Sequence, residues 1–166
     1  MSTTGYHDAP LARPAVGAGR ELILTRILPA PRDRVFRAWT RQLPQWWGPH
    51  GMTMLFCEID LRPGGVFRLV LQAPNGTEYP SRGVFLEVVE NERIVFTDAF
   101  DSDWQPNPAA FLTAVISFET VAGGRTRYTA RALHWKAEHC AQHQRMGFNQ
   151  GWGESLDRLM TLVSRS

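Results

Sequence analysis

The segment 82–132, followed by a helical pattern over residues 138–163, constrains this chain more than any other feature. The segment predicts four antiparallel strands, because turns such as Glu90-Asn91-Glu92 and Gly123-Gly124 separate its short apolar runs. A curved sheet followed by one long helix can enclose an apolar hollow. Neither part contains a Ser-His-Asp set, a phosphate-cradling glycine loop or a dinucleotide fingerprint. The combination therefore indicates a binding fold.

The preceding residues complete an α+β pattern. Branched apolar side chains predict a strand at 21–28, which Pro29 ends. Pro31 then opens a helix with an apolar face, and a short second helix follows through Trp46-Trp47 until Gly48-Pro49 breaks it. Strands are predicted at 54–60 and 66–72, and the 66–72 strand leads through the hairpin turn at 74–76 into a strand at 77–89.

The predicted strand 125–134 shows most clearly how the sheet is covered. Alternate residues from Arg125 to Arg131 are arginine or threonine, whereas Tyr128, Ala130 and Ala132 lie on the opposite face. One face is then solvated and the other covered by helices. We expect the curved antiparallel sheet to wrap around the long C-terminal helix, with the two short helices after the first strand.

Length and charge limit the class of protein. The 166 residues fit one domain, which we place at 20–166 after a disordered tail at 1–19. The tail has no apolar core of a signal peptide, and no apolar run approaches the roughly 20 residues that span a bilayer. The net charge is only +2, and the arginines are scattered. We therefore expect a cytoplasmic protein that binds neither nucleic acid nor membrane.

Cysteines and histidines do not suggest a metal site. Cys57 and Cys140 are distant in sequence and are expected to be free thiols. His139 and His143 have a spacing that can bind metal on a helix, but no acidic ligand accompanies them. We interpret both as solvent-facing and expect no metal and no cofactor.

Short motifs in a fixed order resemble a known family. They cover residues 21–163 and comprise Ala30-Pro31, Val35-Phe36, Ala38-Trp39-Thr40, Trp46-Trp47-Gly48-Pro49, Asp60-Leu61-Arg62-Pro63-Gly64-Gly65, Gly83 with Glu87-Val88, Arg93-Ile94-Val95-Phe96-Thr97, and Gly151-Trp152 with Ser155-Leu156 and Leu159. This set resembles the domain related to the C-terminal part of the activator of heat-shock protein 90 ATPase. That domain is a branch of the START-related, Bet v 1-like superfamily, so the resemblance implies a helix-grip fold.

The resemblance also implies a choice of partners. Stand-alone members of the family look like small-molecule binding proteins, and related branches include lipid carriers and polyketide cyclases. In the eukaryotic activator a separate N-terminal domain contributes to ATPase stimulation, whereas only about 20 residues precede the first strand here. We therefore expect a small apolar or amphipathic ligand rather than a chaperone as the partner.

Such a ligand would lie between the sheet and the C-terminal helix. Pockets of this kind are mostly apolar, with few orienting polar groups. The candidate lining residues are aromatic or apolar side chains that face inward by strand parity or helical spacing. They are Trp39, Trp47, Phe67, Leu69, Phe96, Tyr128, Met146 and Trp152. No catalytic residue is assigned.

Two alternatives remain open. A cyclase- or hydrolase-like enzyme would use Tyr128 together with Asp98 or His134, and requires at least two of these side chains to face one cavity. A protein partner, either a chaperone or a second copy of the chain in a homodimer, would use Trp104 in the predicted loop 101–108.

Two glycines in the C-terminal helix pattern lead to a prediction about stability. Gly147 and Gly151 are four residues apart and could make room beside the sheet. If they do, alanine at position 151 should destabilise the fold or weaken ligand binding, against the gain of roughly 1 kcal/mol that helix propensity predicts.

Overall fold

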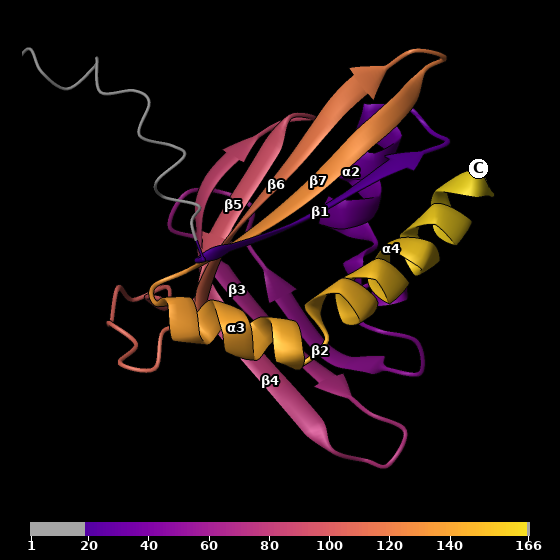
Figure 1. Cartoon of the computed structure of the whole chain (residues 1–166). Coiled ribbons are helices and arrows are strands. Elements are labelled where there is room, and N and C mark those ends of the chain that lie inside the picture. The colour runs from indigo at the N-terminus through magenta and orange to yellow at the C-terminus, as the bar shows by residue number, and fades with distance from the viewer. Residues whose placement is uncertain (1–18, 166) are drawn as a thin grey trace, which may run out of the picture.

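One curved antiparallel sheet forms the body of the molecule, as the computed structural model shows for residues 19–165 (Figure 1). The predicted tail lies outside these residues except for Gly19. The strand order is β1-β7-β6-β5-β4-β3-β2. The strands are β1 (Glu21–Leu28), β2 (Thr53–Ile59), β3 (Val66–Gln72), β4 (Glu78–Val89), β5 (Arg93–Thr97), β6 (Leu112–Val121) and β7 (Arg125–His134). Every neighbouring pair is antiparallel, which confirms the predicted sheet.

Strand β7 has the two faces that its sequence predicted. Tyr128, Ala130 and Ala132 are buried, whereas Arg125 and Arg127 are exposed. On the outer face Arg131 is paired with Glu21 of β1, and Arg127 lies 3.6 Å from Glu119 of β6. The inner face is therefore the one available to the core and to any ligand.

Two irregularities help to curve the sheet. The β2–β3 register shifts between Met54 and Phe56, and the β4–β5 register shifts between Phe85 and Glu87. Close backbone approach also fixes Gly83, where a Cβ atom would lie 2.1 Å from the carbonyl oxygen of Thr97. Gly83 thus allows β4 and β5 to approach closely, and the register shift lies a few residues further along β4.

The helices lie on the concave side of the sheet (Figure 1). Helix α2 (Arg32–Arg41) buries Val35, Phe36 and Trp39, as its pattern predicted. The short second helix is a single 3₁₀ turn, η3 (Leu43–Gln45), that ends before Trp46-Trp47. In the C-terminal part, α3 (Ala137–Arg145) packs against β7, and α4 (Phe148–Ser164) packs against β1 and α2. None of the helices within residues 19–165 is long and apolar enough to cross a membrane.

The expectation of one continuous helix over 138–163 was wrong. Gly147 has φ +95° and ψ 41°, a left-handed conformation that cannot continue a right-handed helix. The chain therefore changes direction between α3 and α4, as Figure 1 shows. The expected crowding at Gly151 is also absent, because a Cβ atom there would meet only Cγ of Pro49, at 3.5 Å.

Aromatic side chains dominate the core between sheet and helices. Trp39, Trp46, Phe85 and Phe118 are almost completely buried. The indole of Trp46 donates a 3.0 Å hydrogen bond to the carbonyl oxygen of Ala38, which fixes the loop after η3 onto α2. Large rings of this kind leave irregular gaps where they meet, and two of those gaps form the candidate site.

Candidate functional site

Two hollows lie side by side under the C-terminal helices. The junction hollow, about 220 Å³, runs between β7, the loop 46–49 and the junction of α3 with α4. The sheet hollow, about 410 Å³, lies over β3, β4 and β5. Trp47, His143 and Trp152 border both hollows and form the wall between them. Together they offer a space of the size that holds a small ligand, mostly apolar in the junction hollow and partly polar in the sheet hollow, where Arg82, Asp98 and Asn107 contribute.

Most of the predicted lining residues border this space. Trp47, Tyr128, Met146 and Trp152 line the junction hollow. Trp47 and Trp152 also line the sheet hollow, together with Phe67, Leu69 and Phe96. Trp39 borders neither hollow, because it is completely buried within the core. Met146 is 68% exposed and belongs to the rim.

Ring contacts make the floor of the sheet hollow rigid. Phe67 and Phe96 stack with ring centroids 4.5 Å apart and an interplanar angle of 16°. Phe85 meets Phe67 edge-on at 5.5 Å. Trp47 touches both Phe67 and Phe96, at 6.5 and 6.2 Å. Offset and edge-on aromatic pairs add to the area that they bury, so this surface is preformed.

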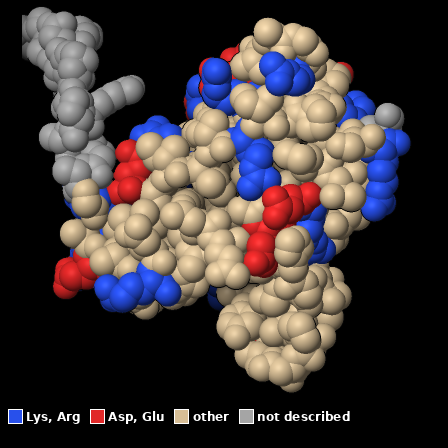
Figure 2. All heavy atoms as spheres, turned by 45° about the vertical axis from the view of Figure 1, so that its right-hand side comes forward, with Lys and Arg blue, Asp and Glu red and all other residues tan. Residues whose placement is uncertain are grey.

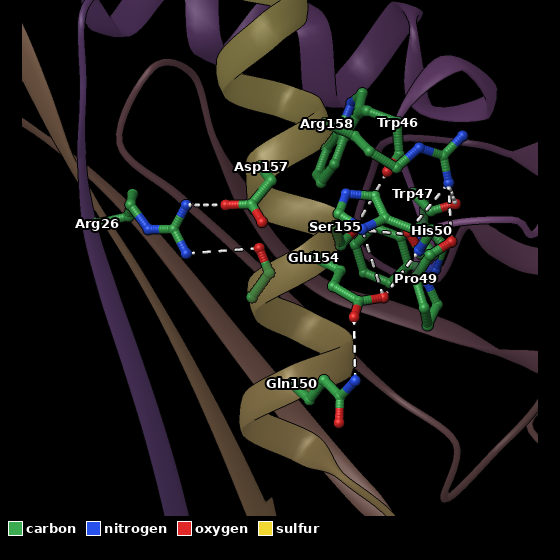
Figure 3. A network of polar contacts seen from close by, with 12 residues as sticks. Arg26, Trp46, Trp47, Pro49, His50, Gln150, Glu154, Ser155, Asp157 and Arg158 are labelled. Atoms are coloured by element: carbon green, nitrogen blue, oxygen red, sulfur yellow. Dashed lines mark hydrogen bonds and ion pairs between the residues drawn. The ribbon is translucent and has the colours of Figure 1, made fainter.

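Polar contacts from α4 hold the loop that carries Trp47 (Figure 3). The hydroxyl of Ser155 accepts a 3.0 Å hydrogen bond from the amide of Gly48 and donates one to the carbonyl oxygen of Trp46. The guanidinium of Arg158 donates to the carbonyl oxygens of Gly48 and Pro49, at 3.0 and 3.3 Å. The carbonyl oxygen of Pro49 also accepts the amide of Met52, at 3.2 Å, so Arg158 and Ser155 complete the hydrogen bonds of the loop backbone.

A carboxylate extends the same network. Glu154 accepts a 3.0 Å hydrogen bond from the amide of His50 and another from the side chain of Gln150 (Figure 3). These hydrogen bonds lower the pKa of Glu154. One helix thus fixes a whole loop, and with it the indole that divides the hollows.

His143 is not solvent-facing as the sequence suggested. It is only 8% exposed, and its Nδ1 lies 2.9 Å from Nε2 of His134. Rings of Phe111, Phe148 and Trp152 surround it, at centroid distances of 5.1, 5.1 and 6.0 Å. Burial, with a smaller contribution from the neighbouring His134, lowers its pKa to about 4. Both imidazoles are therefore neutral at pH 7.

His139 also differs from its interpretation as a solvent-facing residue. Its ring lies against Phe111, and its Nδ1 is buried without a hydrogen-bond partner. Within residues 19–165 no group of three or more His, Cys, Asp or Glu side chains is arranged to hold a metal ion. Cys57 and Cys140 are free thiols, as predicted, and burial raises the pKa of each.

Tyr128 does not meet the other two residues of the enzymatic alternative. Tyr128 borders the junction hollow, and its hydroxyl accepts a 3.2 Å hydrogen bond from the indole of Trp39. Asp98 borders the other hollow and accepts hydrogen bonds from the amides of Phe111 and Leu112. His134 lies six residues beyond Tyr128 on the same strand, roughly 20 Å away at 3.3 Å per residue. No substrate atom could reach both.

Trp104 lies on the outside of the protein, away from the hollows. It is 54% exposed, has φ +61°, and touches Phe100 edge-on at 5.8 Å. The carboxylate of Asp101 holds this loop by accepting hydrogen bonds from the amides of Asp103 and Gln105. On the face drawn in Figure 2, acidic and basic side chains are interspersed, and neither sign forms a continuous stripe.

The fold defines a helix-grip α+β protein with two half-open hollows beneath its C-terminal helices. Residues 29–164 match the family model of "Activator of Hsp90 ATPase homolog 1-like protein". The chain belongs to this family, as its motifs suggested. A comparison with curated proteins finds no match.

Solved structures with the same fold support the assignment. A protein from Nitrosomonas europaea is 37% identical, with a TM-score of 0.84 over 89% of this chain and 96% of that chain. A protein from Mycobacterium smegmatis is 28% identical, with a TM-score of 0.74 over 87% and 91%. One from Chromobacterium violaceum is 26% identical, with a TM-score of 0.71 over 86% and 96%.

Sequence reasoning missed several residues that border the hollows. His143 lines both, Ser155 lines the junction hollow, and Thr97 and Phe111 line the sheet hollow. The position of His143 in the helical pattern did not indicate that it is buried, because its burial depends on the turn at Gly147, which changes the direction of the chain. Phe111 lies just before a strand, where parity does not determine its direction.

Proposed function

We propose that this protein binds a small, largely apolar ligand in the space between the sheet and the C-terminal helices. The observation that carries the proposal is the pair of adjoining hollows, about 220 and 410 Å³, with walls made mainly of aromatic and aliphatic side chains. Apolar surface left uncovered inside a domain costs dispersion contacts that a bound molecule restores. A ligand that fits is therefore favoured by burial of its own apolar surface.

The architecture of the wall supports the same function. The loop with Trp47 is held by hydrogen bonds from Ser155 and Arg158 rather than by packing alone. These contacts hold the backbone beside Trp47, and a site whose wall is already in place loses less side-chain freedom on binding. Membership of a family whose fold commonly binds ligands agrees with this proposal.

Native mass spectrometry of the protein as purified is the first experiment. We expect a mass increment that disappears on denaturation and identifies a co-purified apolar molecule. The second experiment titrates the neutral fluorescent probe N-phenyl-1-naphthylamine and follows quenching of tryptophan emission. Saturable one-to-one binding is expected, and an absence of both the increment and the binding would contradict the proposal.

A blocking variant locates the bound probe. Ser81 is exposed and lines the sheet hollow from β4. Phenylalanine at this position should fill the edge of the hollow and weaken binding of the probe by about tenfold, the loss of roughly 1.4 kcal/mol. Glu78→Phe adds the same ring to an exposed position of β4 that borders neither hollow, and should leave affinity unchanged. Equal affinities of the two variants would place the probe elsewhere.

A protein partner is the second candidate. The observation that favours it is the exposed indole of Trp104, held in a left-handed backbone conformation by a hydrogen-bonded loop. The family description also names an activator of a chaperone ATPase. The test is the ATPase rate of the cognate heat-shock protein 90 with the wild-type protein and with Trp104→Ala. Stimulation that the substitution abolishes would support this function, and an unchanged rate would contradict it.

A further inference from the structure

The two buried histidines form a chain of hydrogen bonds that begins at a backbone carbonyl. Nδ1 of His134 lies 3.3 Å from the carbonyl oxygen of Arg20, which also accepts the backbone amide of His134 at 2.8 Å. Nε2 of His134 lies 2.9 Å from Nδ1 of His143. Three of the four imidazole nitrogens are thus engaged, and only Nε2 of His143 has no partner among the described residues.

The carbonyl at one end fixes where the protons are. A carbonyl oxygen only accepts hydrogen bonds, so Nδ1 of His134 must carry a hydrogen. In a neutral imidazole the other nitrogen is then an acceptor, and Nε2 of His134 receives its hydrogen bond from Nδ1 of His143. By the same rule, Nε2 of neutral His143 has no hydrogen and carries a lone pair. The reverse arrangement would set two lone pairs against each other at His134 and Arg20.

That lone pair faces the hollows. Among residues 19–165, the only buried side-chain nitrogen or oxygen without a partner is Nδ1 of His139. Nε2 of His143 therefore retains accessible surface, although its residue is only 8% exposed. His143 borders both hollows, and the rings of Phe111, Phe148 and Trp152 cover its other sides. The accessible surface of Nε2 therefore opens into the hollows that His143 borders.

We propose that Nε2 of His143 is the polar anchor of the site and accepts a hydrogen bond from the ligand, which is therefore an apolar molecule with a neutral hydroxyl or N–H group. This inference rests on the proposed function and specifies its ligand class. Nε2 of His143 has no protein partner within residues 19–165, so a donor on the ligand replaces water at an acceptor that the walls of the hollow partly shield from solvent. At Nε2 of His143 a carboxylate would set its own lone pairs against a lone pair and is disfavoured there. The charged side chains of the lining, Arg82 and Asp98, border the sheet hollow only. His134 acts as a positioning residue that fixes the tautomer of His143.

Matched probes test the ligand class. We would measure the binding of 2-naphthol, 2-methoxynaphthalene and 2-naphthoate by tryptophan quenching at pH 7.5. The alcohol should bind about fivefold to tenfold tighter than its methyl ether, the size expected of one neutral hydrogen bond to a buried acceptor. The carboxylate should bind most weakly. Equal binding of alcohol and ether would overturn the anchor while leaving the proposed function intact, and no binding by any probe would overturn both.

Substitution of the anchor is the second arm. His143→Phe keeps an aromatic ring and removes the acceptor, so it should reduce the preference for the alcohol to less than about twofold while the ether still binds. His139→Phe alters a neighbouring imidazole that borders neither hollow and should retain the full preference. A preference that survives in His143→Phe would contradict the proposal.

A measurement on the wild-type protein keeps the inference testable if the variant does not fold. Two-bond ¹H–¹⁵N correlation spectra distinguish protonated from unprotonated imidazole nitrogens. We expect His143 to show a protonated Nδ1 and an unprotonated Nε2, whose shift changes when 2-naphthol binds. A protonated Nε2 would overturn the assignment whatever the variants show.

Discussion

Trp47 and Trp152 lie with ring centroids 6.1 Å apart, and both indoles border the two hollows. One comes from the loop after η3 and the other from the second turn of α4, so the wall depends on the packing of distant segments. Substitution of either tryptophan removes part of the wall and leaves the sheet unchanged. The size and shape of these two side chains therefore limit the volume available to a ligand.

Trp152→Ala should merge the hollows. Because the indole is only partly buried, we expect a loss of about 2–3 kcal/mol in the free energy of unfolding, at the lower end for tryptophan truncation. Urea unfolding measures this loss, and probes larger than naphthalene should bind relatively better. Trp135 is 57% exposed, and its replacement by alanine should change stability by less than about 0.5 kcal/mol. Equal stability of the two variants would show that Trp152 is not part of a packed wall.

Tyr128→Phe tests the polar contact in the core. The substitution leaves Nε1 of Trp39 buried without an acceptor, which should cost about 1–3 kcal/mol. Burial raises the pKa of Tyr128, so the wild-type hydroxyl stays protonated throughout the accessible pH range. Tyr79→Phe removes a hydroxyl from an exposed tyrosine and serves as the control in urea unfolding. A neutral Tyr128→Phe variant would indicate that another group accepts from Trp39.

Ser155→Ala should loosen the loop that carries Trp47. It removes the acceptor of the Gly48 amide and the donor to the carbonyl oxygen of Trp46, both in a buried setting, at a cost of about 1–3 kcal/mol. Hydrogen exchange at Gly48 should become faster together with this loss. Thr161→Ala removes an exposed hydroxyl of α4 that donates only to its own helix, and should be nearly neutral. Unchanged exchange at Gly48 would show that Arg158 alone holds the loop.

The sequence predicted the sheet and the family well because their determinants are local. Strand β7 alternates arginine or threonine with buried residues, and this period of two directly shows which face is covered. Tight turns such as Gly123-Gly124, with φ +82° and +69°, require glycine and mark the hairpin ends. The inward direction of Phe67 and Phe96 followed from the same parity.

The parts that sequence reasoning missed depend on contacts between distant segments. Gly147 was interpreted as a helical residue, because a single glycine in an amphipathic pattern gives no sign of its backbone conformation. The turn at Gly147 brings His143 against His134, so the histidine pair could not be predicted while the helix was drawn as continuous. Trp39 faces inward from α2, as the lining residues do from their own elements, yet Tyr128 and Phe85 cover it. The apolar pattern of the sequence alone therefore does not distinguish a residue buried in the core from a residue that lines a hollow.

Stability should fall as the solution becomes mildly acidic. The pKa values of His134 and His143 are lowered in the folded protein, that of His143 from 6.5 to about 4. Above pH 6.5 His134 and His143 are neutral in both the folded and the unfolded protein, so their contribution to stability is fully present. Below pH 6.5 these histidines become protonated in the unfolded chain but stay neutral in the folded protein. The free energy of unfolding therefore falls progressively until folded His143 is protonated near pH 4.

The size of this loss has an upper limit. The lowering of the His143 pKa corresponds to at most about 3 kcal/mol, and we expect about 1–2 because the ring faces a water-accessible hollow. Among charged or titratable neighbours, Asp98 raises the pKa of His134 and His139 lowers it. Urea unfolding between pH 7.5 and 5 measures how much stability the two histidines lose. The hydrogen bond from Arg93 lowers the pKa of Glu87, so this carboxyl group does not titrate in the range. His143→Phe should flatten the slope, and an equally steep slope in that variant would contradict the assignment.

Alanine substitutions at Gly147 and Gly151 should have opposite effects on stability. Gly147 has φ +95°, where a side chain costs about 1–2 kcal/mol, so alanine should lower the melting temperature despite the open space around it. Gly151 lies within α4, and its added methyl group would make an ordinary contact with Pro49 at 3.5 Å. Helix propensity then favours alanine by up to about 1 kcal/mol. Thermal unfolding measures both changes. Destabilisation by Gly151→Ala would show instead that α4 cannot tolerate a methyl group beside the loop and that the hollow depends on its absence.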